Sequence, residues 1–177
     1  MKLIIVRHGD PDYSIDSLTE KGWREAHCLA DRLVKEPADY YYCSPLGRAR
    51  DTAKETMERL GRSYEVCDWL REFQTAVHRP DAQGRLTGCW DWLPQDWADR
   101  PEIHRQGGWL ENPIMKEGNV KKEYDWVVSE LDKLILRHGY RREGNLYKVE
   151  RGNNDTIVMF CHFGVESVLL SRLINIP

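Results

Sequence analysis

Short apolar runs alternate with amphipathic stretches along this chain of 177 residues. The runs at residues 3–6 and 156–161 are rich in aliphatic and β-branched side chains, and each predicts a buried strand. Two further runs, at residues 40–43 and 64–70, predict two more strands. Strands that alternate with helices are typical of α/β domains with a parallel sheet.

Helical periodicity lies between these strands. Thr19 is a predicted N-cap, and Gly139 is a predicted C-cap. Ser44 is predicted to cap another helix with Pro45 at its first position. The four predicted helices cover residues 20–35, 45–60, 120–137 and 165–174. With right-handed crossovers, the pattern predicts a three-layer α/β/α sandwich with a mostly parallel central sheet.

The regular pattern stops between residues 73 and 115, in an irregular insertion that contains four of the seven tryptophans. These are Trp90, Trp92, Trp97 and Trp109. The insertion either folds over the strand ends as a lid with aromatic walls, or its tryptophans anchor a long connection to the core. We expect most of them to be anchors and one or two to face substrate. Residues 140–154 are predicted to form an exposed loop.

Length and composition limit the classes of function. A chain of 177 residues fits one domain, residues 1–177, that buries about two-thirds of its unfolded surface. A net charge of −3 argues against nucleic acid as a partner. Five scattered cysteines suit a reducing compartment and support no disulfide or zinc framework. The first apolar run is too short for a signal peptide or a membrane span, so we expect a cytoplasmic protein without a membrane partner.

Chemically active side chains follow each predicted strand. His8 follows the first, Ser44 the second, Glu72 the third and His162 the last. Because the carboxyl ends of parallel strands lie along one edge of a sheet, these side chains are expected to form a single site.

The residues expected at this edge suit a phosphoryl group. Arg7 and Arg48 supply guanidinium groups that match phosphate oxygens in pairs, and His162 adds another donor. Neighbouring positive charge favours the neutral form of His8, whose imidazole can then attack phosphorus. Glu72 is the carboxyl group best placed to protonate the leaving group.

These residues lie in motifs whose order and spacing resemble those of the histidine phosphatase superfamily, also called phosphoglycerate mutase-like. The motifs are Arg7-His8-Gly9, Ser44-Pro45-Leu46-Gly47-Arg48 followed by Thr52-Ala53, Leu70-Arg71-Glu72, and His162-Phe163-Gly164.

The resemblance implies a metal-independent phosphomonoesterase that acts on a small phosphorylated metabolite. By resemblance, His8 is phosphorylated, Arg7, Arg48 and His162 bind the phosphoryl oxygens, Glu72 handles protons, and neither metal nor other cofactor is needed. The stretch Asp10-Pro11-Asp12-Tyr13 lacks the asparagine common in the mutase branch, which favours a phosphatase. Relatives continue with more strands beyond the last predicted helix, so the chain is expected to be either truncated or a short member of the family.

Other functions stay open at this point. One is a cofactor-dependent phosphomutase of the same superfamily, and another is a phosphate-binding module without turnover. A third is a metal-dependent hydrolase with His8, Asp10, Asp12 and His162 as ligands.

Individual residues have alternatives too. Glu72 has a structural alternative, an ion pair with an arginine. Arg50 lies in the same helical turn as Arg48, and Ser44 is expected to be only an N-cap. The identity of the substrate and the oligomeric state are not predicted.

Overall fold

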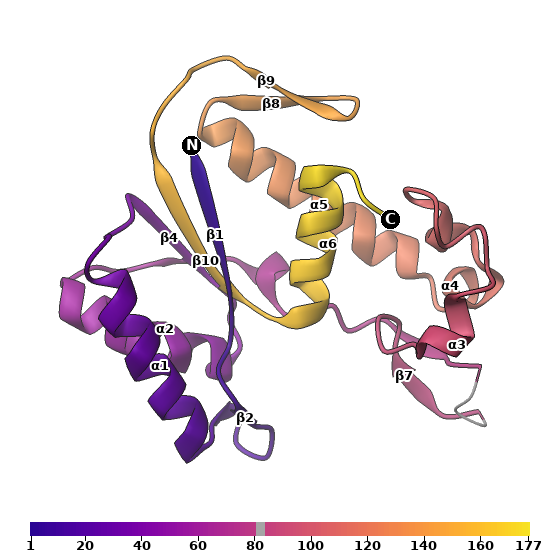
Figure 1. Ribbon diagram of the computed structural model, residues 1–177, viewed down its shortest axis with the longest axis horizontal. Coiled ribbons are helices and arrows are strands. Elements are labelled where there is room, and N and C mark those ends of the chain that lie inside the picture. The colour runs from indigo at the N-terminus through magenta and orange to yellow at the C-terminus, as the bar shows by residue number, and fades with distance from the viewer. Residues whose placement is uncertain (81–83) are drawn as a thin grey trace.

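A parallel β-sheet forms the centre of the protein, as the computed structural model shows (Figure 1). Its strands are β1 (Lys2–Arg7), β10 (Thr156–Cys161), β4 (Tyr40–Cys43) and β5 (Glu65–Val66), in that order across the sheet. The structure describes residues 1–80 and 84–177. Residues 81–83, which fall within the predicted irregular insertion, lie outside the described residues.

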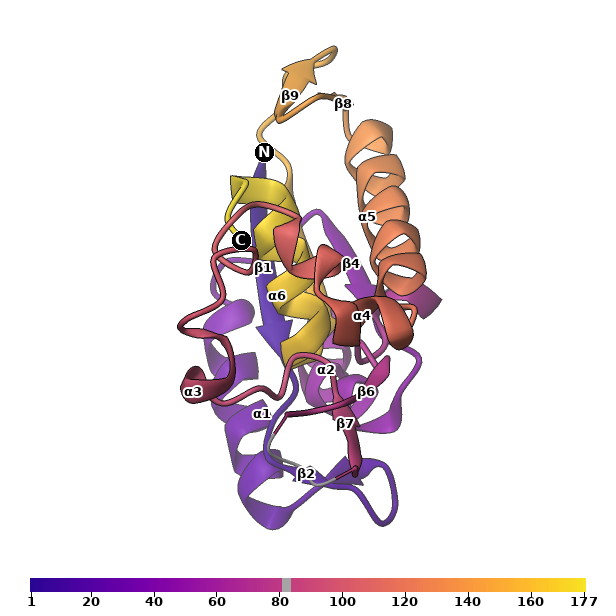
Figure 2. The ribbon, with the colours of Figure 1, turned by 90° about the vertical axis from the view of Figure 1, so that its right-hand side faces the viewer.

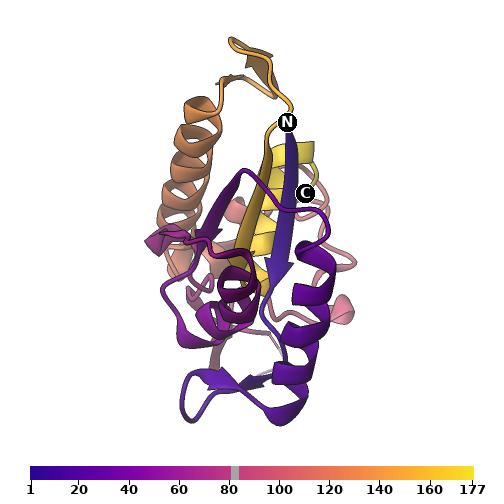
Figure 3. The same cartoon turned by 90° about the vertical axis from the view of Figure 1, so that its left-hand side faces the viewer.

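Helices cover both faces of this sheet (Figures 1 and 3). Helices α1 (Glu20–Leu33) and α2 (Gly47–Leu60) pack on one face, and α5 (Val120–Arg137) and α6 (Phe163–Ile174) on the other. Side chains of β10 alternate between the two cores because successive residues of a strand point to opposite faces. Ile157, Met159 and Cys161 join the α5–α6 core, and Val158 and Phe160 join the α1–α2 core. The predicted three-layer sandwich with a parallel sheet is confirmed.

The ends of two helices follow the sequence signals. Thr19 caps α1, and its Oγ1 accepts a hydrogen bond from the Gly22 amide at 3.1 Å. Helix α5 covers the predicted residues, but its C-cap is His138 and not the predicted Gly139, which follows the cap at a φ of +94° that glycine adopts without strain.

Helix α2 begins later than predicted. Its first residue is Gly47 and its N-cap is Leu46, so the prediction of Ser44 as the cap with Pro45 as first helical residue is wrong. The Ser44 hydroxyl instead contacts His162, a residue from the far end of the chain. Helix α6 begins at Phe163, two residues before its predicted start.

The third predicted strand is much shorter than expected. Strand β5 ends at Val66, and the chain then turns through a 3₁₀ helix, Asp68–Leu70. The turn places both Trp69 and Leu70 in the α5–α6 core. A continued strand would bury only one of them there, because successive residues of a strand point to opposite faces of the sheet.

Residues 140–154 are not the predicted loop. Strands β8 (Tyr140–Glu143) and β9 (Leu146–Val149) form an antiparallel hairpin around Gly144, which has a φ of +58°. Figure 2 shows this hairpin at one end of the molecule and β2 (Pro11–Asp12), which pairs with β3 (Ser17–Leu18), at the opposite end.

The insertion consists of short elements packed beside α5 and α6 (Figures 1 and 2). They are β6 (Ala76–His78), β7 (Leu86–Gly88), α3 (Pro94–Trp97), the 3₁₀ helix Gly108–Glu111, and α4 (Pro113–Glu117). Buried side chains from it join the α5–α6 core, namely Phe73, Val77, Cys89, Leu110 and Met115. Within the described part of the chain, no helix is long and apolar enough to cross a membrane.

Candidate active site

The carboxyl ends of three neighbouring strands bring His8, Ser44 and His162 together. The backbone amides of His8 and Ser44 continue the sheet ladder, because they donate to the carbonyls of Cys161 and Phe160 at 3.0 and 2.9 Å. The ring centroids of His8 and His162 are 5.0 Å apart. Side chains separated by most of the sequence thus share one site at this edge of the sheet.

The His8 ring is held in one tautomer. Its Nδ1 lies 2.7 Å from the Gly9 carbonyl oxygen, which can only accept, so Nδ1 carries the proton and Nε2 keeps its lone pair. Burial lowers the pKa of His8; the Gly9 hydrogen bond opposes this effect, and the charges of Arg48 and Arg7 add to it. The result is a neutral imidazole with a nucleophilic nitrogen.

His162 is fully buried and contacts the second strand end. Its Nε2 lies 2.8 Å from Ser44 Oγ, which also accepts a hydrogen bond from the Leu46 amide at 3.2 Å. Burial, followed by the charges of Arg48 and His8, lowers the pKa of His162 to about 3. Its Nδ1 is buried with no hydrogen-bond partner among the described residues.

Arg48 extends from the first turn of α2 and is buried. Its Nη1 lies 2.6 Å from Asp16 Oδ1, and Asp16 Oδ2 accepts the Gly47 amide at 2.7 Å. Burial opposes the charged form of Asp16, but the hydrogen bonds from Gly47 and Arg48 outweigh it and lower its pKa. Arg48 Nε is buried and has no partner within the described residues.

Asp16 and Ser44 contribute contacts that the sequence did not predict. Asp16 has a φ of +49°, a conformation that aspartate tolerates better than most residues, and its partners lie 31 and 32 residues away. No local pattern therefore marks it. The serine–proline pair at Ser44 is a helix-start signal, which hid its contact with His162.

Arg7 lies at the open side of the site. Its side chain is exposed, and its guanidinium carbon lies 5.6 Å from the centroid of the Phe163 ring. The Phe163 ring meets the edge of Trp90, at 5.6 Å between centroids. A cation held over an aromatic face in this way is partly oriented but still accessible to a ligand.

Glu72 is fixed at the start of α6. Its Oε1 accepts three backbone amides, from Phe73 at 2.8 Å, Gly164 at 2.9 Å and Val165 at 3.3 Å. All hydrogen bonds that the structure gives this side chain go to Oε1, which leaves Oε2 available to exchange a proton.

The contacts of two neighbouring arginines bear on the alternative assignments. Arg71 pairs with Glu123 at 2.7 Å and not with Glu72, whose partners are backbone amides. Arg50 is exposed, and its Nε lies 3.4 Å from the Tyr64 hydroxyl, whereas Arg48 is buried and its charge adds to the effect of burial in lowering the pKa of both His8 and His162. Arg48 is therefore the arginine of this turn that can hold an anion there.

The acidic residues after His8 do not join the two histidines. Asp10 Oδ2 accepts from the Thr19 hydroxyl at 2.7 Å, and Asp12 Oδ1 accepts from the Ser14 amide at 3.0 Å. Among residues 1–80 and 84–177, no three His, Cys, Asp or Glu side chains are grouped closely enough to hold a metal ion. The ligand set of the metal-dependent alternative is not assembled.

Close backbone packing positions the loop after β1. The Gly9 amide donates to Thr52 Oγ1 at 3.0 Å, and this hydroxyl donates to the Arg48 carbonyl at 2.8 Å. A Cβ on Gly9 would lie 2.9 Å from the Gly22 carbonyl oxygen, and one on Gly22 would lie 2.2 Å from that of Asp10. Side chains at these positions would push the loop after β1 away from α1.

Comparison with known proteins identifies the family of this chain. The model of the histidine phosphatase superfamily (branch 1) matches residues 3–132, which include His8, Arg48 and Glu72. The chain belongs to the histidine phosphatase superfamily. His162 lies beyond the matched segment, and the sheet brings it to the other members of the site.

Several phosphatases are similar to this member of the superfamily. An adenosylcobalamin/alpha-ribazole phosphatase of Salmonella typhi is 32% identical over 196 residues, which cover 100% of this chain and 81% of that protein. One of the same name from Salmonella typhimurium is 31% identical over 111 residues, 52% of this chain and 54% of the relative. The solved structure of a mycobacterial glucosyl-3-phosphoglycerate phosphatase has a TM-score of 0.58 at 23% identity and covers 99% of this chain and 80% of its own.

These matches confirm the family and the fold predicted from the sequence. They also support the predicted activity, that of a phosphatase for small metabolites. The structural likeness, at 23% identity, supports the fold alone.

Proposed function

We propose that this protein is a metal-independent phosphomonoesterase that hydrolyses a small phosphorylated metabolite through a phosphohistidine on His8. One observation carries the proposal. Two buried nitrogens, Arg48 Nε and His162 Nδ1, have no partner among the described residues, and they lie at the site of the free His8 Nε2. Because unpaired buried donors are costly, an anion that accepts from both would relieve that cost.

In the first step, His8 Nε2 attacks phosphorus and the bond between phosphorus and the alcohol oxygen breaks. The electron pair of that bond stays on the alcohol oxygen, which takes a proton from Glu72 Oε2. Arg7, Arg48 and His162 stabilise the charge on the phosphoryl oxygens. Each such donor is worth about 3 kcal/mol in the transition state, on the scale measured for oxyanion holes.

In the second step, water attacks the phosphorus of the phosphohistidine. Glu72, now a carboxylate, accepts a proton from that water, and the bond between phosphorus and Nε2 breaks with its electron pair returning to His8. Inorganic phosphate leaves, and both residues are back in their starting states.

The tautomer of His162 fits this role. Ser44 Oγ already accepts from the Leu46 amide, so its own proton is free to be donated to His162 Nε2. The imidazole proton then resides on Nδ1, the buried atom without a protein partner, and points to a phosphoryl oxygen.

Our proposal includes a single domain over residues 1–177 and a cytoplasmic location. All five cysteines are free, and four of them are buried, which suits a reducing compartment. The stretch from Asp10 to Tyr13, which lacks the asparagine expected of a mutase, supports hydrolysis over transfer to a second hydroxyl.

The test is to trap the intermediate. After brief exposure to radiolabelled phenyl phosphate, the protein is expected to carry an acid-labile, alkali-stable label, and His8→Ala is expected to lose both label and turnover. His27→Ala is a matched control, because His27 is exposed on α1 outside the site. Turnover by His8→Ala equal to that of the control, or activity that vanishes with chelator and returns with a divalent ion, would refute the proposal.

A further inference from the structure

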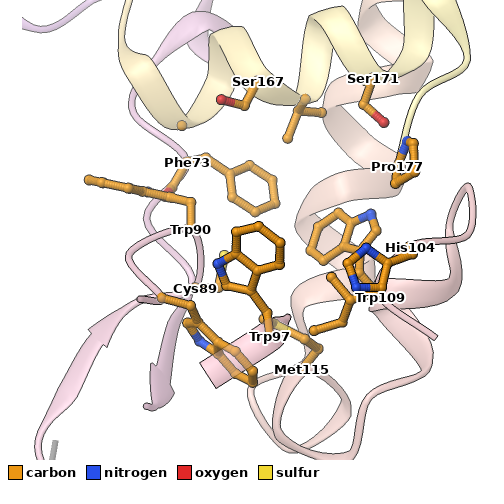
Figure 4. A pocket seen from close by; sticks show the side chains of 14 residues that line it. Phe73, Cys89, Trp90, Trp97, His104, Trp109, Met115, Ser167, Ser171 and Pro177 are labelled. Atoms are coloured by element: carbon orange, nitrogen blue, oxygen red, sulfur yellow. The ribbon is translucent and has the colours of Figure 1, made fainter. Parts of the chain in front are cut away.

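A large aromatic pocket lies between the insertion and α6, beside the candidate active site. Its volume is about 370 Å³, within the range of about 300–1,000 Å³ typical of small-molecule sites. Figure 4 shows the rings of Phe73, Trp97 and Trp109 gathered toward its centre, below the hydroxyls of Ser167 and Ser171 on α6. All four tryptophans of the insertion line this pocket.

The pocket adjoins residues that hold Glu72, although the side chains assigned to the reaction do not themselves line it. Gly164 and Phe73 both line it, and their amides are the ones that hold Glu72 Oε1. Trp90 donates its indole N–H to the Phe73 carbonyl at 2.9 Å. A Cβ on Gly164 would lie 2.6 Å from the Trp90 ring and 2.7 Å from Glu72 Oε1, so the indole and the carboxylate both pack against this glycine. We take this shared glycine as the place where a group attached to the alcohol oxygen protonated by Glu72 would enter the pocket.

The lining suits an uncharged group. None of the described residues that line the pocket is Asp, Glu, Lys or Arg. Ser167 Oγ already donates to the Phe163 carbonyl at 3.0 Å, and Ser171 Oγ to the Ile176 carbonyl at 2.7 Å. The guanidinium carbon of Arg100 lies 5.7 Å from the centroid of the Trp92 ring, but Arg100 is not part of the lining. A carboxylate or a second phosphate would therefore lose its hydration there without a charged side chain in the wall to bind it, which is strongly unfavourable.

One polar atom of the lining lacks a partner. The indole Nε1 of Trp92 is buried and makes no hydrogen bond to any described residue. A ring nitrogen or carbonyl of a bound group would satisfy it, and the surrounding rings offer edge and face contacts to a flat ligand.

We propose that this pocket is the leaving-group subsite and that it selects phosphomonoesters whose alcohol carries an uncharged, flat aromatic ring. The proposal rests on the proposed function, because it takes the phosphoryl group to be bound between His8, Arg48 and His162. It adds the class of substrate, and it excludes esters whose alcohol carries a second charge, such as phosphoserine.

Non-hydrolysable phosphonates test the subsite without turnover. Calorimetry compares 3-phenylpropylphosphonate with propylphosphonate, which present the same anion and differ by one ring. The phenyl compound is expected to bind tenfold to a hundredfold more tightly, the equivalent of about 1.4 to 2.8 kcal/mol. Equal affinities would overturn the subsite.

Two variants locate the effect. Trp97→Leu removes an aromatic wall, and Ser167→Leu fills the pocket from an exposed position on α6, where leucine favours the helix. Each is expected to reduce the ratio of the two affinities at least fivefold while binding of propylphosphonate stays the same. Trp23→Leu, on the exposed side of α1, is the matched control and should keep the ratio. A ratio that survives Ser167→Leu in a folded protein would overturn the proposal even if Trp97→Leu fails to fold.

Turnover separates this proposal from the proposed function. Hydrolysis of 3-phenylpropyl phosphate is expected to exceed that of propyl phosphate and of phosphoserine in kcat/KM by the same tenfold to hundredfold. His8-dependent hydrolysis without any preference among the three would overturn the subsite alone. A binding preference without hydrolysis of any ester would overturn the proposed function alone.

Discussion

Replacing Glu72 with glutamine separates its chemistry from its structural contacts. Three backbone amides donate to Oε1, and the carbonyl oxygen of a glutamine can accept all three in the same place. The amide nitrogen that replaces Oε2 cannot act as a general acid. Glu72→Gln should therefore fold like the native protein and lose proton transfer.

The two effects differ in size. In the starting state of the proposed cycle Glu72 is protonated, so its Oε1 is a neutral acceptor, and the carbonyl oxygen of glutamine keeps comparable hydrogen bonds with a change of roughly 1 kcal/mol or less in the free energy of unfolding. General acid catalysis contributes about 10²–10⁴-fold to rate when the leaving group needs a proton. Alkyl phosphates should therefore slow by about that factor, and p-nitrophenyl phosphate, whose leaving group is stable as an anion, should slow much less.

The assay measures kcat/KM for a series of esters whose alcohols differ in pKa, together with urea unfolding. Glu123→Gln is a matched control, because the Glu123 carboxylate pairs with Arg71, which has no role in the proposed reaction. In the native protein kcat/KM should depend only weakly on the pKa of the alcohol. In Glu72→Gln kcat/KM should fall steeply as that pKa rises. If alkyl and p-nitrophenyl phosphates slow by the same factor, Glu72 is not the acid, and the reasoning from its free Oε2 fails.

Three other outcomes are expected. Arg48→Lys should lower kcat/KM for phenyl phosphate by about 10²–10³-fold, because the compact ammonium group of lysine cannot replace a planar guanidinium group that also binds Asp16. Unchanged kinetics would mean that this arginine does not bind the phosphoryl group. Ser44→Ala should lower the free energy of unfolding by about 1–3 kcal/mol, because it leaves His162 Nε2 buried without its partner, and urea titration would show whether stability is instead unaffected. Burial lowers the pKa of His162 to about 3 from the ordinary 6.5, so between these two pH values the unfolded chain binds a proton at this residue and the folded protein does not. The free energy of unfolding should therefore have its full value above pH 6.5 and fall by up to roughly 4–5 kcal/mol as the pH drops toward 3. His162→Gln should flatten that part of the curve of unfolding free energy against pH, and a curve of unchanged slope would contradict the burial argument.

Much of the fold could be predicted because its signals are local. The apolar runs that became β1, β4 and β10 and the stripes that became α1 and α5 depend on residues within a few positions of one another. Predictions failed where a local signal competed with a distant contact. The serine and proline before α2 resemble a helix start, but Ser44 contacts a residue 118 positions away. The run after Tyr64 resembles a strand, but the chain turns at Asp68–Leu70, and this turn buries the side chains of both Trp69 and Leu70 in the core.

The candidate site divides in the same way. The sequence alone determined which side chains follow the strands, and the parallel sheet made it certain that His8 and His162 would share an edge. Only the tertiary structure decided that Asp16 holds Arg48, that Glu72 takes the amides at the start of α6, and that four tryptophans line one pocket. The physical reason is range: backbone periodicity and capping act over a few residues, whereas hydrogen bonds, burial and pKa shifts depend on distances that exist only once the chain has folded.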